Sequence, residues 1–252
     1  MKKTRFKTKI LLTFLLVAAL QPIGAQLPQQ EVLNRGVVAV KTDDGVFVSW
    51  RYLGTDSPSA GFNLYRDGEK LNSEPITSST NYVDAGGTLS STYVVKRVDY
   101  GRETDESEAT AVWDTFYKKI KLQRPPSGVT PPYTVTNSGN EENYPNGQFY
   151  SYTPNDCSAG DVDGDGEYEI IVKWDPSNSR DNSFYGYTGE VYLDCYKMDG
   201  TQLWRINLGR NIRAGAHYTQ FMVYDLDGDG KAEVACKTAP GTIDGQGKAV
   251  LM

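Results

Sequence analysis

The sequence predicts an all-β protein in which a fibronectin type III-like β-sandwich is followed by the first blades of a β-propeller. Three observations support this prediction. Residues 32–114 contain short apolar or alternating runs separated by turn signals, residues 161–173 return as residues 225–237, and no long apolar stripe of helical period follows the first 25 residues. Short alternating runs are typical of strands, and a repeated unit of strands indicates a radial architecture.

The chain begins with a basic segment that runs into an apolar one. Residues 1–25 carry five basic and no acidic side chains, and the apolar run Ile10–Leu20 is about half of the ~20 residues that a membrane helix needs. This pattern predicts a secretory signal peptide and a protein secreted to the periplasm or the extracellular space, without a membrane span. Cleavage would move the formal charge from −6 to −11. Such an acidic chain does not favour nucleic acid as a partner, because phosphate contacts need clustered Lys and Arg.

The β-sandwich is expected over residues 27–115. Its strand-like runs are Val37–Val40, Val46–Trp50, Phe62–Tyr65 and Tyr93–Val98, separated by Asp-Gly and Gly-Gly turn signals. Trp50 and Tyr65 resemble core positions of a fibronectin type III-like domain. We therefore expect both side chains to pack in the core.

A change of composition follows this module. Residues 116–150 contain Pro125–Pro126, Pro131–Pro132 and the polar run Asn137–Asn140, which predicts a linker or the start of the propeller. The partial calcium-binding propeller is then expected over residues 151–252. Its cysteines, Cys157, Cys195 and Cys236, have no zinc-ligand spacing and are expected in the core. Their odd number excludes full pairing within the chain, and the sequence leaves open whether any two form a disulfide.

Two Asp-rich loops are the strongest local signature. Each has Asp at positions 1, 3 and 5, Gly at position 6 and Glu at position 9, a pattern in which oxygen ligands wrap a calcium ion and position 7 adds its backbone carbonyl. The expected ligands of the first loop are Asp161, Asp163, Asp165, Glu167 and Glu169, and those of the second are Asp225, Asp227, Asp229, Lys231 and Glu233. We expect both calcium ions to be structural, because they hold together carboxylates that would otherwise repel one another.

The residues after each loop distinguish this pattern from helical calcium sites. Residues 169–174 and 233–237 are β-branched or apolar and predict strands, whereas a dockerin or an EF-hand places a helix beside its loop. Between the two copies, Val191–Tyr196 and Leu203–Leu208 flank the turn signal Asp199–Gly200, which predicts a hairpin. A propeller needs several such units. The sequence ends at residue 252, just after the second loop, and this predicts an incomplete propeller.

Longer strings resemble a known family. Residues 155–169 and 173–178, residues 211–220 before the second loop, and residues 33–36 are similar to polysaccharide lyase family 11, the rhamnogalacturonan lyases. The resemblance covers nearly all of the chain after residue 25. It implies a small N-terminal β-domain before a propeller, and therefore identifies the chain as an N-terminal piece of such an enzyme.

The resemblance implies cleavage of rhamnogalacturonan I, the pectin backbone of alternating rhamnose and galacturonate, by β-elimination. This reaction needs a group that neutralises the galacturonate carboxylate, a base for the proton at C5 and an acid for the leaving oxygen. By motif, Asn155 and Asp175 match the family's substrate-binding residues. The sequence does not identify the base, for which Lys173 and His217, the only histidine, are candidates. The protein is expected to act as a monomer, and this piece of it is expected to have little activity alone.

Two other functions remain open. A non-catalytic calcium propeller of the FG-GAP, integrin-like adhesion type shares the Asp-x-Asp-Gly-Asp-Gly loops but not the residues around Trp174. A carbohydrate-binding protein would use exposed aromatic rings as stacking platforms, and the candidates are Trp174, Tyr185, Tyr187 and Trp204.

Overall fold

The computed structural model describes residues 32–215 and 219–250, so the expected signal peptide and His217 lie outside the described residues. All regular elements of the described part are strands, β1 to β18. This confirms the all-β prediction. Among the same residues there is no helix that could cross a membrane.

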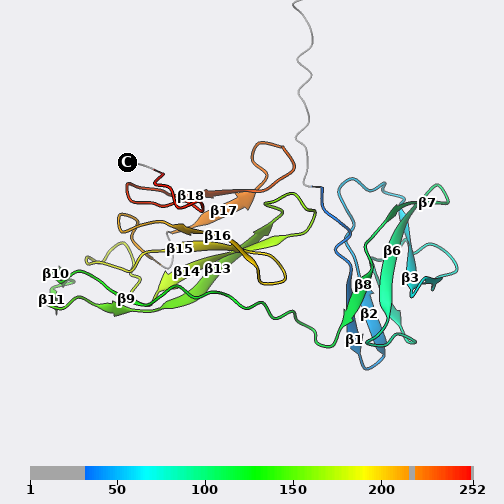
Figure 1. Ribbon diagram of the computed structural model, residues 1–252, viewed down its shortest axis with the longest axis horizontal. Coiled ribbons are helices and arrows are strands. Elements are labelled where there is room, and N and C mark those ends of the chain that lie inside the picture. Colours follow the sequence, from blue (N-terminus) through cyan, green and yellow to red (C-terminus); the bar gives the residue numbers. More distant parts are fainter. Residues whose placement is uncertain (1–31, 216–218, 251–252) are drawn as a thin grey trace, which may run out of the picture.

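Eight strands form one curled sheet near the N-terminus, at the right of Figure 1. They are β1 (Val38–Thr42), β2 (Gly45–Ser49), β3 (Gly61–Arg66), β4 (Glu69–Lys70), β5 (Asn81–Asp84), β6 (Thr92–Asp99), β7 (Arg102–Glu106) and β8 (Thr110–Trp113). The strand order is β4-β3-β6-β8-β1-β2-β5, and β7 pairs with β6. Strand β8 pairs antiparallel with β6 and parallel with β1, so it joins the two halves into a continuous sheet.

The turn signals of this region form tight turns as expected. Asp67 and Gly68 both have positive φ, 50° and 87°, and they connect β3 with β4. Positive φ at both central residues suits the right-handed twist of a hairpin. The apolar runs then place alternate side chains in one core, which consists of Ala39, Val46, Val48, Trp50, Phe62, Leu64, Tyr93 and Val95. Trp50 therefore packs as predicted, whereas Tyr65 is half-buried and its hydroxyl donates a hydrogen bond to Glu103.

A buried ion pair lies at the edge of this core. The guanidinium of Arg35 contacts both carboxylate oxygens of Asp56 at 2.6 and 2.8 Å, and Asp105 and Arg97 complete the network. Burial by itself would raise the pKa of the Asp56 carboxyl, but hydrogen bonds from Arg35, from the Leu53 amide and from Arg97 lower it to about 2. The network ties the segment before β1 to the sheet.

The second region contains ten strands, shown at the left of Figure 1. They are β9 (Gly128–Val129), β10 (Tyr133–Asn137), β11 (Asn140–Tyr144), β12 (Phe149–Tyr150), β13 (Tyr152–Gly160), β14 (Glu169–Pro176), β15 (Tyr192–Tyr196), β16 (Gln202–Asn207), β17 (Phe221–Tyr224) and β18 (Glu233–Cys236). Strands β13 to β16 form an antiparallel four-stranded sheet in sequence order, and β17 pairs with β18. The predicted hairpin between the loops is the β15–β16 pair.

Part of the stretch expected as a linker or the start of the propeller is a hairpin. Strands β10 and β11 are antiparallel, with Tyr133 opposite Tyr144 at one end and Asn137 opposite Asn140 at the other. Ser138 and Gly139 form the turn, with φ of 50° and 80°. Residues Thr134–Thr136 alternate as in a strand, but the surrounding prolines and polar residues favoured a loop instead.

The cysteines differ from the expectation in one respect. All three are free, Cys195 is buried and Cys236 is half-buried, but Cys157 is exposed rather than in the core. Cys157 lies on β13, which pairs with another strand of its sheet on one side only, and the residues around it are exposed. Among the described residues, no neighbouring strand therefore covers the Cys157 side chain, although cysteine is an apolar residue.

The two regions touch at the first Asp-rich loop. The Asn34 amide donates to the Gly166 carbonyl at 2.9 Å, and the guanidinium of Arg51 lies 4.6 Å from the centre of the Tyr168 ring. The same guanidinium donates to the Asn34 carbonyl, so both contacts belong to one arrangement. The segment before β1 thus rests on the loop that follows β13.

We predict that Asp56→Asn destabilises the protein by about 3 kcal/mol, because removing one partner leaves a buried guanidinium incompletely paired. Denaturant unfolding followed by Trp fluorescence measures the change. Asp44→Asn, in an exposed turn, is the matched control and should stay within about 0.5 kcal/mol of the parent. Equal midpoints for the two variants would contradict the role of the pair.

The pH dependence of the Asp56 contribution follows from its low pKa. A carboxyl whose folded pKa lies below the unfolded value of about 3.9 stabilises the protein above that value, and the contribution is lost as pH falls through the folded pKa. The stability difference between the parent and Asp56→Asn should therefore be full at pH 6, shrink below about pH 4 and disappear as pH falls through about 2. A difference that is constant from pH 6 to pH 2 would contradict this prediction.

Candidate functional site

The two Asp-rich loops repeat each other bond by bond. In the first, the Asp161 carboxylate accepts the amides of Gly164, Asp165 and Gly166 at 2.7, 3.1 and 2.9 Å. In the second, Asp225 accepts the amides of Gly228, Asp229 and Gly230 at 2.7, 3.2 and 3.0 Å. The position-1 Asp therefore closes each loop through its side chain.

The closing glutamates and the glycines repeat as well. Glu169 accepts the Val162 amide at 3.0 Å, and Glu233 accepts the Leu226 amide at 2.7 Å. Gly166 and Gly230 have φ of 89° and 94°, a conformation that glycine adopts without a steric penalty. The 64-residue repeat in sequence is thus a repeat in backbone conformation.

Each loop brings three carboxylates together. One oxygen each of Asp161, Asp163 and Glu169 lie within 4.8 Å of one another, as do oxygens of Asp225, Asp227 and Asp229. Asp165 and Glu233 were expected in these groups but lie outside them. Hard carboxylate oxygens gathered in this way suit a calcium ion.

A lysine that the sequence analysis did not consider contacts the first loop. The Lys197 ammonium contacts Asp163 at 2.6 Å and Asp165 at 2.7 Å. These hydrogen bonds raise the pKa of Lys197, and the bond from Lys197 lowers the pKa of the Asp165 carboxyl. Lys197 follows β15 and is far from the loop in sequence, so no local spacing could have indicated it.

Burial destabilises the ionised carboxylates of the first loop. Glu169 and Asp161 are each 1% exposed. Burial raises the pKa of the Glu169 carboxyl, and the charges of Asp163 and Asp165 raise it further. The chemistry of this donor set therefore fits a bound cation, because a cation would stabilise the ionised form of every member.

The residues expected to bind substrate meet at an irregularity in the β13–β14 pair. Thr153 pairs with Asp175 and Pro154 with Trp174, but the register then shifts, so Asn155 and Asp156 form a bulge. Both bulge residues are exposed. Bulges commonly re-aim side chains beside functional sites, and this one sets Asn155 and Asp156 out of the regular ladder.

A buried lysine lies opposite the bulge. Lys173 is 0% exposed, and its ammonium donates to Asp156 at 2.7 Å and lies 3.9 Å from Asp175. Asp175 is 6% exposed, and its buried Oδ1 has no hydrogen-bond partner among the described residues. Burial raises the pKa of the Asp175 carboxyl, although the Lys173 charge works against this rise. Asp175 therefore keeps an acceptor that can engage a further donor.

The equivalent lysine of the second repeat has a different environment. Lys237 follows β18 and is exposed, whereas Lys173 lies within β14 and is completely buried. Strand β14 has neighbours on both sides, whereas β18 pairs, among the strands that the structure describes, with β17 alone. Equal positions in the repeat thus do not give equal burial.

Arg213 is a further basic residue that the sequence analysis did not identify as a candidate. The Nε and Nη2 atoms of Arg213 are buried and have no hydrogen-bond partner within the described residues. Burial raises the pKa of the nearby Tyr133 hydroxyl, and the charges of Arg180 and Arg213 oppose this rise. Tyr187 packs edge-on against Tyr133 with ring centres 5.4 Å apart. Two buried guanidinium nitrogens that have no partner among the described residues favour an anionic ligand such as a carboxylate.

The four aromatic residues considered as stacking platforms divide into two groups. Trp174 is 2% exposed and its indole donates to Asp194, and Trp204 packs against the core around Leu193. Tyr185 and Tyr187 are more than half exposed. Of these four residues, the two tyrosines are therefore the ones that can offer a ring face to a sugar.

Comparison with known proteins identifies relatives over both regions. The profile of "Rhamnogalacturonan lyase family 11, C-terminal domain" matches residues 117–251, and that of "Rhamnogalacturonan I lyases beta-sheet domain" matches residues 28–113. The rhamnogalacturonan endolyase YesW of Bacillus subtilis (strain 168) is 56% identical over 253 residues, which cover 99% of this chain and 38% of YesW. The rhamnogalacturonan exolyase YesX of the same organism is 57% identical over 222 residues, 88% of this chain and 34% of YesX.

Solved structures agree with this similarity. The crystal structure of the exotype lyase YesX superposes with a TM-score of 0.80 over 88% of this chain and 34% of that chain. The rhamnogalacturonan lyase PL11 of Bacillus licheniformis superposes with a TM-score of 0.80 at 60% identity, over 90% of this chain and 36% of that chain. The chain thus spans about a third of the length of these relatives.

We predict that Lys173→Met destabilises the protein by about 3 kcal/mol, because Asp175 loses the charge that opposes its burial. Lys237→Met is the matched control from the second repeat and should change stability by less than about 0.5 kcal/mol, since that side chain is exposed. Thermal or denaturant unfolding measures both.

A spectroscopic measurement separates this electrostatic role from packing. Carbon NMR of the Asp175 carboxyl should show a higher pKa in Lys173→Met than in the parent, because the lysine charge lowers it. An unchanged Asp175 titration in a destabilised variant would mean that Lys173 only fills space.

Proposed function

Because this chain belongs to rhamnogalacturonan lyase family 11, we propose that it forms part of an enzyme that cleaves rhamnogalacturonan I by β-elimination. The observation that carries this proposal is the match of family profiles to both regions, together with 56% and 57% identity to two rhamnogalacturonan lyases. One relative is an endolyase and the other an exolyase, and their nearly equal identities favour neither mode.

Within this proposal, Asn155 and Asp175 bind the substrate. Asn155 is exposed on the bulge. The Asp175 Oδ1, which no described residue hydrogen-bonds, can accept a hydrogen bond from a sugar hydroxyl. Lys173 is suited to positioning rather than proton abstraction, because it is completely buried and held between two carboxylates. It keeps Asp156 and Asp175 in place beside the bulge.

Arg213 is proposed as a group that neutralises the galacturonate carboxylate. Its buried Nε and Nη2 donors, which have no partner among residues 32–215 and 219–250, can form charge-assisted bonds with a carboxylate. Stabilising that carboxylate makes the neighbouring C5 proton more acidic, which is what β-elimination requires. The base that removes this proton is not assigned to a described residue.

Calcium is proposed at both loops in a structural role. Asp161, Asp163 and Glu169 would hold one ion and Asp225, Asp227 and Asp229 the other, with Glu167 and Lys231 offering backbone carbonyls. Bound calcium would supply positive charge to these carboxylates. The second loop lies against the first, where the Ala232 amide donates to the Asp161 carbonyl at 2.7 Å, so each loop supports the other.

For the architecture, we propose a fibronectin type III-like sandwich over residues 27–115, a connection over 116–150 and propeller blades over 151–252. The four antiparallel strands β13 to β16 have the size and order of one blade, and the repeated loop with β17 and β18 begins the next. The basic and apolar residues 1–25 support export to the periplasm or the extracellular space.

We predict that calcium raises the thermal midpoint of the chain. At a hundredfold excess of calcium over the dissociation constant, each site should add about 2.7 kcal/mol to the free energy of unfolding. Calorimetric titration should give two sites, and Asp163→Asn and Asp227→Asn should each remove one. Asp43→Asn, which lies in an exposed turn, should leave both sites intact. Absence of binding to the parent protein would overturn the calcium proposal.

We predict that the protein, at the full length of its relatives, produces the ultraviolet absorbance of an unsaturated uronate from rhamnogalacturonan I. Asp175→Asn should lower kcat/KM about tenfold or more, because a hydrogen bond with a charged group is lost. Lys237→Met should match the parent. A folded, calcium-bound parent protein that gives no absorbance would sink the lyase assignment.

A further inference from the structure

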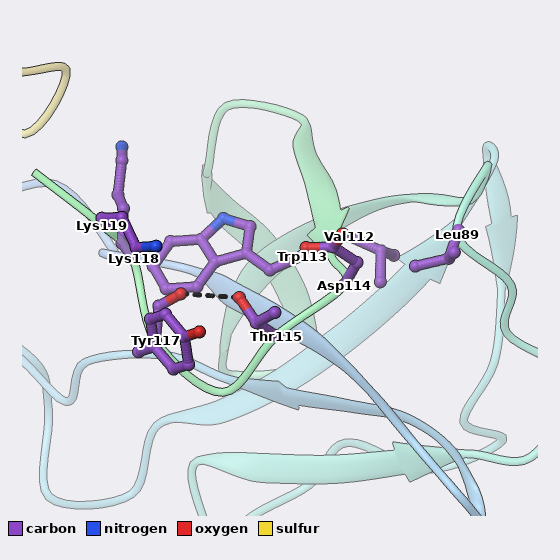
Figure 2. A pocket seen from close by; sticks show the side chains of 8 residues that line it. All are labelled: Leu89, Val112, Trp113, Asp114, Thr115, Tyr117, Lys118 and Lys119. Carbon is purple, nitrogen blue, oxygen red and sulfur yellow. Dashed lines mark hydrogen bonds between the residues drawn. The ribbon is translucent and has the colours of Figure 1, made fainter.

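A hollow opens where the first sheet ends and the connection begins. It has a volume of about 690 Å³ and is shown in Figure 2. The side chains that line it are Leu89, Val112, Trp113, Asp114, Thr115, Tyr117, Lys118 and Lys119. None of them belongs to the Asp-rich loops or to the surroundings of Asp175, so the hollow is separate from the site described above.

The hollow combines an aromatic ring with positive charge. Trp113 is the last residue of β8, and its backbone is held by pairing with Val40 of β1. The Lys118 ammonium lies 5.8 Å from the centre of the Trp113 ring, and Figure 2 shows Lys118 beside that ring, with Lys119 next to it in the chain. The Thr115 hydroxyl donates to the Tyr117 carbonyl at 2.8 Å, which fixes the turn between ring and lysines. The turn therefore brings the Lys118 ammonium close to the Trp113 ring.

The charge of this segment is opposite to that of the whole chain. Residues 118–124 carry Lys118, Lys119, Lys121 and Arg124 and no acidic side chain, in a chain of formal charge −6. All four are exposed, and Tyr117 is 62% exposed. Asp114 is the only acidic residue that lines the hollow. A local excess of positive charge attracts anionic ligands at moderate ionic strength.

We propose that this hollow is an accessory binding site for a galacturonate-bearing oligosaccharide. A galacturonate ring has an apolar C–H face, which can stack on Trp113 or Tyr117, and a carboxylate, which can meet the Lys118 or Lys119 ammonium. The ligand class rests on the proposed function, because the proposed substrate is a chain with a carboxylate on every second sugar. A second contact with the same polymer would keep it near the enzyme by raising its effective concentration.

The test uses calorimetric titration of the full chain, in saturating calcium, with an unbranched galacturonate hexamer. Binding is expected in low salt and should weaken as salt rises, because exposed charges are screened beyond about 10 Å at 0.1 M. The fully methyl-esterified hexamer, which lacks the charges, should bind more weakly. The double variant Lys118→Gln/Lys119→Gln should lose about fivefold in affinity. Lys70→Gln, an exposed lysine on β4, is the matched control and should bind as the parent does.

Two further variants locate the site and keep its outcome distinct from that of the lyase assignment. Trp113→Phe should abolish hexamer-dependent quenching of Trp fluorescence, whereas Lys237→Gln, at an exposed lysine of the second region, should leave hexamer affinity unchanged. Equal affinity of the parent and the Lys118/Lys119 double variant would overturn the proposal, as would loss of all binding in Lys237→Gln. Because none of these readouts involves bond cleavage, an inactive lyase could still have this site, and an active one could lack it.

Discussion

The loop closed by the Asp161 carboxylate is the point on which the arrangement of the chain depends. Its two oxygens accept three amides of its own loop, and its carbonyl accepts the Ala232 amide of the second loop. Gly166, at the end of the loop, accepts the Asn34 amide from the first sheet's leading segment. A buried anion thus organises contacts among three parts of the sequence, and such an anion is stable only with donors or positive charge around it.

The same constraint governs the residues near the bulge. Asp175 and Lys173 are buried in one strand, and their charges oppose each other's desolvation across 3.9 Å. Asp156 completes the group because the bulge lets an exposed residue reach the buried ammonium. These two acidic centres therefore use different counter-charges. Near the bulge the counter-charge is a lysine within the strand, whereas at the first loop it is Lys197, which forms ion pairs with Asp163 and Asp165.

The features that could be predicted from sequence are those that depend on neighbours along the chain. The Asp-rich loops form as expected because their hydrogen bonds join residues at most seven positions apart. Trp50 packs in the core because strand alternation places it there. By contrast, the contact of Lys197 with Asp165, the pairing that makes the bulge and the exposure of Cys157 depend on which strands become neighbours. No pattern within one segment contains that information, and the buried donors of Arg213 were missed for the same reason.

Strand β8 has a consequence for how the first region is made. It is the last strand of its sheet in sequence, yet it pairs with both β6 and β1, and its partner Val40 lies more than seventy residues earlier. Until β8 pairs, β1 has an unpaired edge, and such an edge can pair with other chains. Completion of the sheet must wait for this long-range contact, and contacts between residues distant in sequence form slowly. The edge of β1 is therefore covered only when the aromatic residue beside the basic segment has docked on it.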